Sequence, residues 1–392
     1  MPSRPIYLDH QATTPVDPRV LEAMLPYFTD CPGNPSSLSH GYGWEASAAV
    51  KYAREQIASA IHAQPEALLF TSGATEANNL AIKGVAEAYF QKGRHLITVQ
   101  TEHSAVLEPC RYLQSLGFEV TFLPVQPDGL LELSLLEQAI RPETILVSVM
   151  AANNEIGVLQ PLSEIGAICH RHQVLFHTDA AQALTKVPLD VAAMQIDLMS
   201  LTAHKIYGPK GIGALYVRQR QPRVRLAPQV HGGGQERGWR SGTLATPQIV
   251  GFAKAVELGL AAAETEQPYL AQLRDQLWRQ LRSQEGIHLN GHPTQRLAGC
   301  LNISVEGVDG QALLLALQPK VALSSGSACA SGKTSPSHVL LALGREPALA
   351  AATLRFGLGR LNTPREIDQA AACAIAAIQA LRKTPSAQWV PG

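Results

Sequence analysis

The sequence lacks several features that mark whole classes of protein. Its 392 residues contain no uncharged apolar run long enough to span a bilayer, and the first residues contain no apolar segment typical of a signal peptide. Its 32 Lys and Arg residues balance its 32 Asp and Glu residues, and it contains no internal repeat or low-complexity tract. These absences predict a globular protein that binds neither membranes nor nucleic acids.

Local clusters do not change that prediction. The basic residues Arg218, Arg220, Arg223 and Arg225 alternate along the chain, which favours one solvated face of a strand or loop over a nucleic-acid site.

Paired cysteine spacing is also absent. The six cysteines are Cys31, Cys110, Cys169, Cys300, Cys329 and Cys373. Scattered thiols are typical of a reducing compartment, so we expect a cytoplasmic protein without disulfides. Cys169, His170 and His172 lie within one predicted amphipathic helix with no second ligand cluster nearby. This favours a solvated helix face, and we therefore predict no metal site.

What the sequence does contain is an alternation of short apolar runs and helical stretches. The predicted strands include 95–99, 144–150, 174–177, 196–201 and 213–217, and the predicted helices include 44–61 and 76–90. Strands that alternate with helices predict an α/β domain with a mostly parallel sheet covered on both faces.

The pattern changes near Gly251. A long helix is predicted at 252–282, followed by strands at 287–290, 300–305 and 354–358 and helices at 310–317 and 364–382. These elements predict a smaller α+β domain. We expect a large domain over 13–255 and a small one formed by 1–12 and 256–392.

Two residues at the ends of apolar runs indicate a pyridine cofactor. Lys205 follows the run 196–201 and precedes a Gly-Pro turn, and Asp179 ends an earlier run. Functional side chains gather at such strand ends. A desolvated lysine can form a Schiff base, and a carboxylate can keep a ring nitrogen protonated. Alone, Lys205 fits a surface lysine and Asp179 a helix cap, but their combination favours a cofactor site.

A phosphate site is predicted at the start of the helix that follows Phe70. The segment Ser-Gly-Ala74-Thr75 offers backbone N–H groups and a hydroxyl at a helix N-terminus, although a plain capped helix explains it equally well. Thr202 and His204 flank Lys205 and can donate to the same phosphate. Neither the P-loop nor the G-x-G-x-x-G spacing is met.

Four further residues complete the predicted site. Cys329 lies in a loop of small and polar residues, where Lys333 can favour the thiolate; an ordinary loop cysteine is the alternative. His103 follows a predicted strand and can stack on a planar ring and move protons. Asn154 also follows a strand, and Arg355 can pair with a carboxylate.

Taken together, these segments resemble the NifS/IscS-type cysteine desulfurases of the class V aminotransferase-like group. The matching segments are SGATEANN (72–79), EHS (102–104), NNEIG (153–157), HTDAAQ (177–182), AHKIYGPKG (203–211), GGGQERGWRSGT (232–243) and SSGSAC (324–329). They follow one another in order over nearly the whole chain.

The resemblance implies a pyridoxal-phosphate enzyme with the aspartate aminotransferase-like fold, active as a homodimer. The implied residues are Lys205 for covalent attachment, Asp179 at the ring nitrogen, Gln182 at the phenolic oxygen, His103 on the ring, Ala74, Thr75, Thr202 and His204 at the phosphate, Thr243 from the partner subunit, Asn154 and Arg355 at the substrate, and Cys329 as sulfur acceptor.

The implied function is the conversion of L-cysteine to L-alanine, with the sulfur held as a persulfide on Cys329 and passed to an acceptor protein for iron–sulfur cluster or thio-cofactor biosynthesis. Two alternatives remain open. One keeps the cofactor but changes the reaction, as in an aminotransferase or a selenocysteine lyase. The other is a sulfur-relay or scaffold protein that has lost the cofactor.

Overall fold

A seven-stranded sheet forms the centre of the computed structural model, which describes residues 4–220, 223–325 and 336–383. The strand order is β2-β8-β7-β6-β5-β3-β4. The strands are β2 (Leu68–Thr71), β3 (His95–Val99), β4 (Glu119–Leu123), β5 (Thr144–Ser148), β6 (Leu175–Asp179), β7 (Leu198–Thr202) and β8 (Gly213–Val217). Only β8 runs antiparallel to its neighbours, so the predicted mostly parallel sheet is confirmed.

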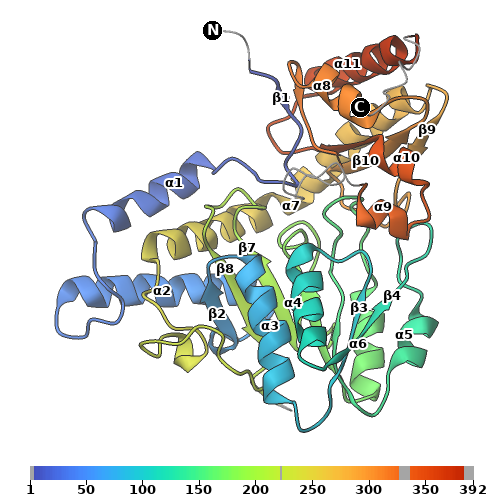
Figure 1. Ribbon diagram of the computed structural model, residues 1–392. Coiled ribbons are helices and arrows are strands. Elements are labelled where there is room, and N and C mark those ends of the chain that lie inside the picture. The colour runs from blue at the N-terminus through green and yellow to red at the C-terminus, as the bar shows by residue number, and fades with distance from the viewer. Residues whose placement is uncertain (1–3, 221–222, 326–335, 384–392) are drawn as a thin grey trace, which may run out of the picture.

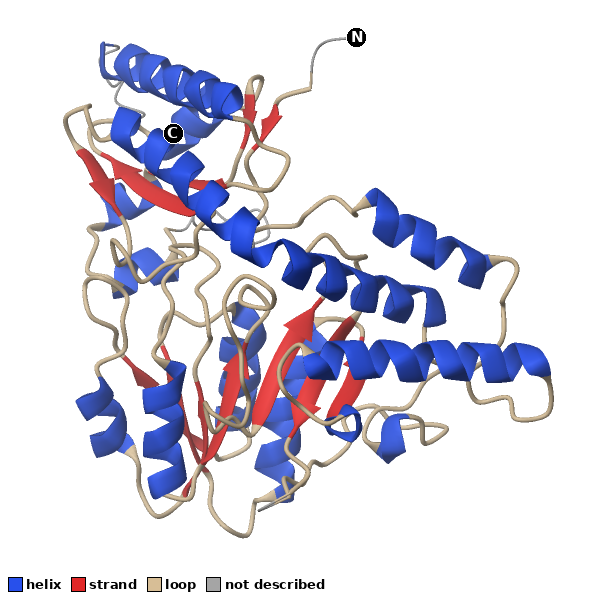
Figure 2. Cartoon of the chain, turned by 180° about the vertical axis from the view of Figure 1, so that it is seen from behind, coloured by secondary structure: helices blue, strands red, loops and turns tan. Residues whose placement is uncertain are grey.

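Helices cover both faces of this sheet (Figures 1 and 2). The apolar side chains of α3 (Ala74–Ala88) and α4 (Ser104–Ser115) pack on one face. Those of α2 (Gly41–Ser59), α6 (Leu162–Arg171) and the first half of α7 (Thr246–Leu281) pack on the other. Every residue of β3, β5, β6, β7 and β8 is buried, because a parallel sheet between two helical layers has no solvated face.

A smaller antiparallel sheet of order β12-β10-β9 lies at the other end of the molecule (Figure 1). Its strands are β9 (Ile287–Leu289), β10 (Cys300–Val305) and β12 (Thr353–Gly357), and they share a core with α8 (Gly310–Leu317) and α11 (Pro364–Lys383). The N-terminal strand β1 (Ile6–Tyr7) pairs in parallel with β11 (Val321–Ala322) beside this sheet.

The remaining elements are short. They are α1 (Pro18–Met24), α5 (Leu133–Ala139), α9 (His338–Ala342), α10 (Pro347–Ala351) and the 3₁₀ turns η1 (Leu25–Phe28), η2 (Pro65–Ala67) and η3 (Glu236–Gly238). Side-chain caps mark the start of helices α1 and α8. The Asp17 side chain accepts from the backbone N–H of Arg19 before α1, and Asp309 caps α8 in the same way.

Helix α7 connects the two ends of the molecule. Its first half buries Ile249 and Phe252 in the core beneath the large sheet, and its second half buries Leu273 and Leu277 in the core of the small sheet. The domain boundary predicted at 255/256 falls inside this continuous helix, and the division into two domains stays a prediction. No helix in the described ranges is long and apolar enough to cross a membrane.

Candidate functional site

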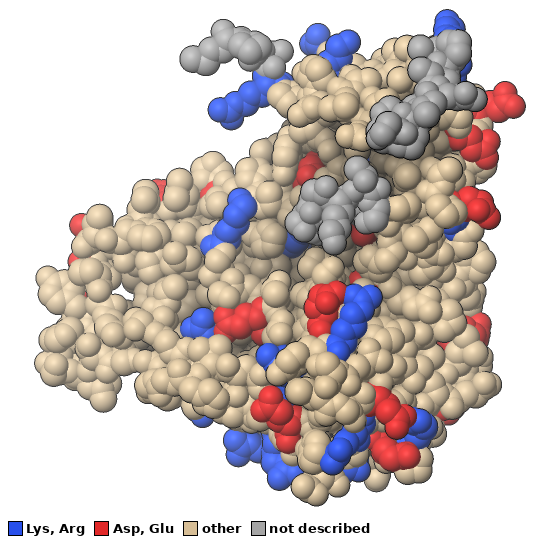
Figure 3. All heavy atoms as spheres, viewed as in Figure 1, with Lys and Arg blue, Asp and Glu red and all other residues tan. Residues whose placement is uncertain are grey.

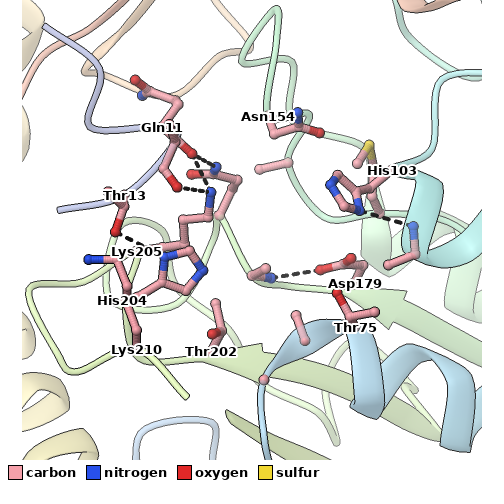
Figure 4. A pocket seen from close by; sticks show the side chains of 18 of the residues that line it. Gln11, Thr13, Thr75, His103, Asn154, Asp179, Thr202, His204, Lys205 and Lys210 are labelled. Atoms are coloured by element: carbon pink, nitrogen blue, oxygen red, sulfur yellow. Dashed lines mark hydrogen bonds between the residues drawn. The ribbon is translucent and has the colours of Figure 1, made fainter. Parts of the chain in front are cut away.

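A cavity of about 450 Å³ opens where the strands of the large sheet end and the small sheet begins. It receives side chains that follow β2, β3, β5, β6 and β7 at their carboxyl ends (Figure 4). Arg355 from β12 also lines it. Ten predicted site residues line it: Ala74, Thr75, His103, Asn154, Asp179, Gln182, Thr202, His204, Lys205 and Arg355. Its volume suits a small-molecule cofactor with a substrate.

Asp179 is the last residue of β6 and is 6% exposed. Its Oδ1 accepts the backbone N–H of Ala181 at 2.9 Å, and its Oδ2 accepts the side-chain amide of Asn78 at 2.6 Å. Both carboxyl oxygens are therefore held, one by the turn after β6 and the other by α3, and Figure 4 shows the carboxyl group turned toward the cavity.

Lys205 follows β7 and reaches across the cavity to the N-terminal segment. Its Nζ donates to the backbone carbonyls of Gln11 and Ala12, the latter at 2.7 Å. Gln182 donates to the same Gln11 carbonyl at 2.8 Å, and Lys186 donates to the Gln182 Oε1 at 3.1 Å. The amine and the Gln182 amide thus share one anchor on residues 11–12.

The opposite side of the cavity is suited to an anion. Helix α3 begins directly after Gly73, whose φ of 149° is a conformation that glycine adopts far more readily than other residues. The first backbone N–H groups of a helix have no hydrogen-bond partner within the helix, so they can bind an anion. The Thr202 hydroxyl and Lys210 line the same region. Burial, with Lys205 and Lys210 nearby, lowers the pKa of His204 to about 4. His204 is therefore neutral at pH 7 in this structure, and its Nδ1 lies 3.2 Å from the Thr13 hydroxyl.

His103 is the N-cap residue of α4. Its Nδ1 accepts the backbone N–H of Ala105 at 3.0 Å, which leaves Nε2 to carry the proton in the neutral ring. Burial lowers the pKa of His103, while Asp179 partly opposes this effect. A neutral imidazole with a fixed tautomer therefore faces the cavity from the side of β3.

Arg355 brings the small sheet into the site. It is 1% exposed, and its guanidinium pairs with the Asp9 carboxylate at 2.9 Å and donates to the Asn154 carbonyl at 3.1 Å. Its Nε has no partner among the described residues. This buried cation can receive a substrate carboxylate at the edge of the cavity.

One predicted site residue does not line this cavity, and another lies outside the described residues. Thr243 is exposed on the segment that follows η3, and it does not line the cavity of its own chain. Cys329 lies in 326–335, outside the described residues. The described residues on either side reach the site, because Ser324 pairs with Arg355 and His338 bonds to the carbonyl of Glu102.

Several residues of the site were not predicted. Gln11, Ala12 and Thr13 form the wall that holds Lys205 and His204, and Asn78 holds Asp179 from outside the cavity. The polar run DHQATT directly after the apolar residues 6–8 was the available signal for the first group, because a polar run at the end of a strand indicates a site.

No group of three or more potential metal ligands occurs within residues 4–220, 223–325 and 336–383. Cys169 is buried in the core, whereas His170 and His172 are exposed. The expected solvated face therefore holds for the two histidines and is wrong for Cys169, because α6 turns that side chain toward the sheet.

Comparison with known proteins gives consistent matches. The aminotransferase class-V family matches residues 6–370. The chain is 56% identical over 366 residues to "Cysteine desulfurase, mitochondrial" of Eremothecium gossypii, covering 93% of this chain and 74% of that protein. Among solved structures, a "NIFS-like protein" superposes with a TM-score of 0.88 at 36% identity, covering 97% of this chain and all of the other.

A further solved structure carries a ligand in its description. "SspA in complex with cysteine" is 41% identical and superposes with a TM-score of 0.80, covering 90% of this chain and 98% of that chain. These matches confirm the predicted fold. They contradict the predicted cytoplasmic location, because several relatives are named mitochondrial. The prediction was wrong because scattered cysteines indicate a reducing environment without distinguishing one compartment from another.

Proposed function

Because the chain belongs to the class-V aminotransferase family and, within it, to the cysteine desulfurases, we propose that it converts L-cysteine to L-alanine and holds the sulfur as a persulfide on Cys329. The enzymes of this family depend on pyridoxal phosphate. The observation that supports the proposal most is the cavity in which the Lys205 amine and the buried Asp179 carboxyl group face one space.

The residues around the cavity fit pyridoxal phosphate. The α3 N-terminus, Thr75, Thr202 and Lys210 suit a phosphate group, since helix N–H groups and a cation both attract an anion. Asp179 suits a pyridine nitrogen, and Gln182 has an amide for the phenolic oxygen. Bound pyridoxal phosphate supplies an electron sink for the electron pair left when the substrate's α-proton departs.

The residues of the chain then have separate tasks. We assign attachment of the cofactor and movement of the α-proton to the Lys205 Nζ, which the carbonyls of Gln11 and Ala12 hold within the cavity. Asp179 would keep a proton on the ring nitrogen of the bound cofactor. His103 would lie beside the ring, where its Nε2–H can donate a proton. Arg355 binds the substrate carboxylate, as its burial and its position at the cavity edge support.

Sulfur transfer requires a thiolate. The Cys329 thiolate forms an S–S bond to the substrate sulfur while the Cβ–S bond of the substrate breaks. The electron pair of the broken bond stays on Cβ, which takes up a proton and becomes the methyl group of alanine. The sulfur remains on the protein as Cys329–S–SH, so atoms and electrons balance without an added oxidant.

The test combines a trap with two variants. Borohydride reduction of the holoenzyme followed by peptide mapping should place the pyridoxyl group on Lys205. Cys329→Ser should keep the cofactor absorption and form no persulfide, whereas Lys205→Ala should lose both. Persulfide formation by Cys329→Ser at the normal level would refute the acceptor, and amino-group transfer to a keto acid without alanine and sulfide would indicate an aminotransferase.

We also propose a homodimer. Seven large apolar side chains on and around α1, η1 and α2 are 49–80% exposed. They are Leu21, Leu25, Phe28, Leu38, Tyr42, Trp44 and Tyr52. This side of the molecule carries few charges in Figure 3, and exposed apolar surfaces of this kind favour protein contacts. Gln235 and Leu244 line a pocket with α2 residues, so the segment that carries Thr243 lies beside the same surface.

Hybrid dimers test the proposed role of Thr243. Subunits with Lys205→Ala and subunits with Thr243→Ala should each be inactive, and mixing them after reversible dissociation should restore activity. The reason is that a hybrid dimer contains one site with an intact lysine and an intact threonine from the partner. Mixing that fails to restore activity, or a monomer in analytical ultracentrifugation, would contradict the proposal.

We propose that residues 1–12 and 256–392 form the small domain that carries Cys329. We further propose that the persulfide passes to an acceptor protein for iron–sulfur cluster or thio-cofactor biosynthesis. Loading the enzyme with ³⁵S-cysteine and adding an extract of its own compartment should move the label to a second protein. Label that stays on Cys329 or leaves only as free sulfide would contradict the proposal.

A further inference from the structure

The carboxyl group of Asp179 has an unexpected neighbour. Asn78 lies one turn into α3, is fully buried, and does not line the cavity. Its Nδ2 donates to the Asp179 Oδ2 at 2.6 Å, while its own Oδ1 has no partner among the described residues. A buried amide left half-satisfied costs stability, so the one hydrogen bond that Asn78 makes indicates a functional role for it.

The contact also links two parts of the cofactor site. Helix α3 starts at the proposed phosphate site and contacts β5, β6 and β7. Asp179 lies at the end of β6 and also accepts the Ala181 N–H at 2.9 Å. The two donors approach different carboxyl oxygens, so together they fix the plane of the carboxyl group relative to the helix that holds the phosphate.

A second buried carboxyl group lies near Asp179, which makes an uncharged hydrogen-bond donor to Asp179 important. Glu102 is fully buried near Asp179, its Oε1 accepts the Met150 N–H at 2.6 Å, and its Oε2 has no partner within the described part of the chain. Burial raises its pKa well above the usual value, and Asp179 adds to this effect. A hydrogen-bond donor stabilises a carboxylate relative to the protonated acid, and the Asn78 amide supplies one without a further charge.

We propose that Asn78 is a positioning residue that donates to Asp179 and holds that carboxylate in place. The proton that lies between Asp179 and the ring nitrogen of the cofactor then stays on the nitrogen instead of on the carboxyl group. This inference rests on the proposed function. Asn78 acts through Asp179, since it does not reach the cavity itself. The ring loses electron-withdrawing power whenever the proton moves from the nitrogen to the carboxyl oxygen.

The experiment locates that proton directly. Holoenzyme is prepared with pyridoxal phosphate labelled with ¹⁵N at the ring, and the ¹⁵N chemical shift is measured for wild type, Asn78→Leu, Asn78→Ala and Asp179→Asn. Both Asn78 variants should move the signal from the protonated toward the unprotonated position. Loss of a hydrogen bond to a charged group predicts a fall of about ten- to a hundredfold in the ratio of protonated ring to protonated acid. In activity, kcat should fall more than KM rises.

A second buried asparagine provides the matched control. Asn290 is also fully buried, and its amide donates to Asn302 and Ser304 at 2.8 Å within the small sheet. Asn290→Leu should lower the unfolding temperature and leave the ¹⁵N signal unchanged.

The outcomes separate the two proposals. An unchanged ¹⁵N signal in both folded Asn78 variants, with a shifted signal in Asp179→Asn, would overturn the role of Asn78 alone. An unchanged signal in Asp179→Asn would overturn the role assigned to Asp179, and with it part of the proposed function.

Discussion

We predict that the ionisation of Glu155 lowers the free energy of unfolding as the pH rises. Its carboxyl group is 6% exposed, and its Oε2 accepts the hydroxyl proton of Ser337 at 2.5 Å. Ser337 in turn caps α9 by accepting the N–H groups of Val339 and Leu340. Burial raises the pKa of Glu155 to about 7, and the Ser337 hydrogen bond and Arg355 offset this effect only in part.

The sign of this pH dependence follows from the number of protons that the folded and unfolded states bind. An unfolded glutamate has a pKa near 4.5, so between that value and about 7 the folded protein binds a proton that the unfolded chain has lost. The stabilising contribution is complete below pH 4.5 and is lost as the pH rises through about 7. A difference of this size corresponds to about 3 kcal/mol in the free energy of unfolding.

Denaturant unfolding of the holoenzyme at a series of pH values between 5 and 8 measures this loss. Glu155→Gln keeps an acceptor for Ser337 and removes the titration, so its free energy of unfolding relative to wild type should rise by about 2.5 kcal/mol across the series. Other titrating groups cancel in this difference. Glu108→Gln, at an exposed site, is the matched control and should give no such rise. Parallel curves for wild type and Glu155→Gln would refute the reasoning.

Two further predictions concern stability and cofactor binding. Glu236 is buried and pairs with both terminal nitrogens of Arg54. Glu236→Gln should therefore lower the free energy of unfolding by about 3 kcal/mol, as when one partner of a buried ion pair is removed. A double-mutant cycle with Arg54→Met that gives no coupling energy would contradict this. A Cβ on Gly213 would lie 2.7 Å from the Cα of Gly73, so Gly213→Ala should displace the turn before α3 and increase cofactor loss on dialysis, measured by absorbance; retention equal to wild type would show that the turn adapts.

The sequence was sufficient for the elements with a strong local signal. Strands β3, β8 and β10 and helix α8 have the predicted bounds, because each is a continuous apolar run or a capped amphipathic stretch. The edge strand β4 gives a weaker signal, since four of its five residues keep some exposure. The pairing of β1 with β11 joins residues more than 300 positions apart, and no local pattern specifies it.

The site shows the same limit. That Lys205 and Asp179 line one cavity could be predicted because Asp179 ends an apolar run, Lys205 closely follows another, and strand ends of a parallel sheet meet at one edge. The contact of Lys205 with Gln11 depends on how the N-terminal segment packs against β7, and the contact of Asn78 with Asp179 depends on the rotation of α3 on the sheet. Both are set by tertiary packing, which side-chain type and spacing do not encode.

The 36 residues of α7 give the molecule a shared structural member about 54 Å long. The two halves of this one helix pack into two separate hydrophobic cores. Detaching either half from its core therefore disturbs the helix on which the other core also depends. The two halves are thereby expected to melt together, and a destabilising change at one end of the helix should also weaken the other end, which packs against β10 and α11.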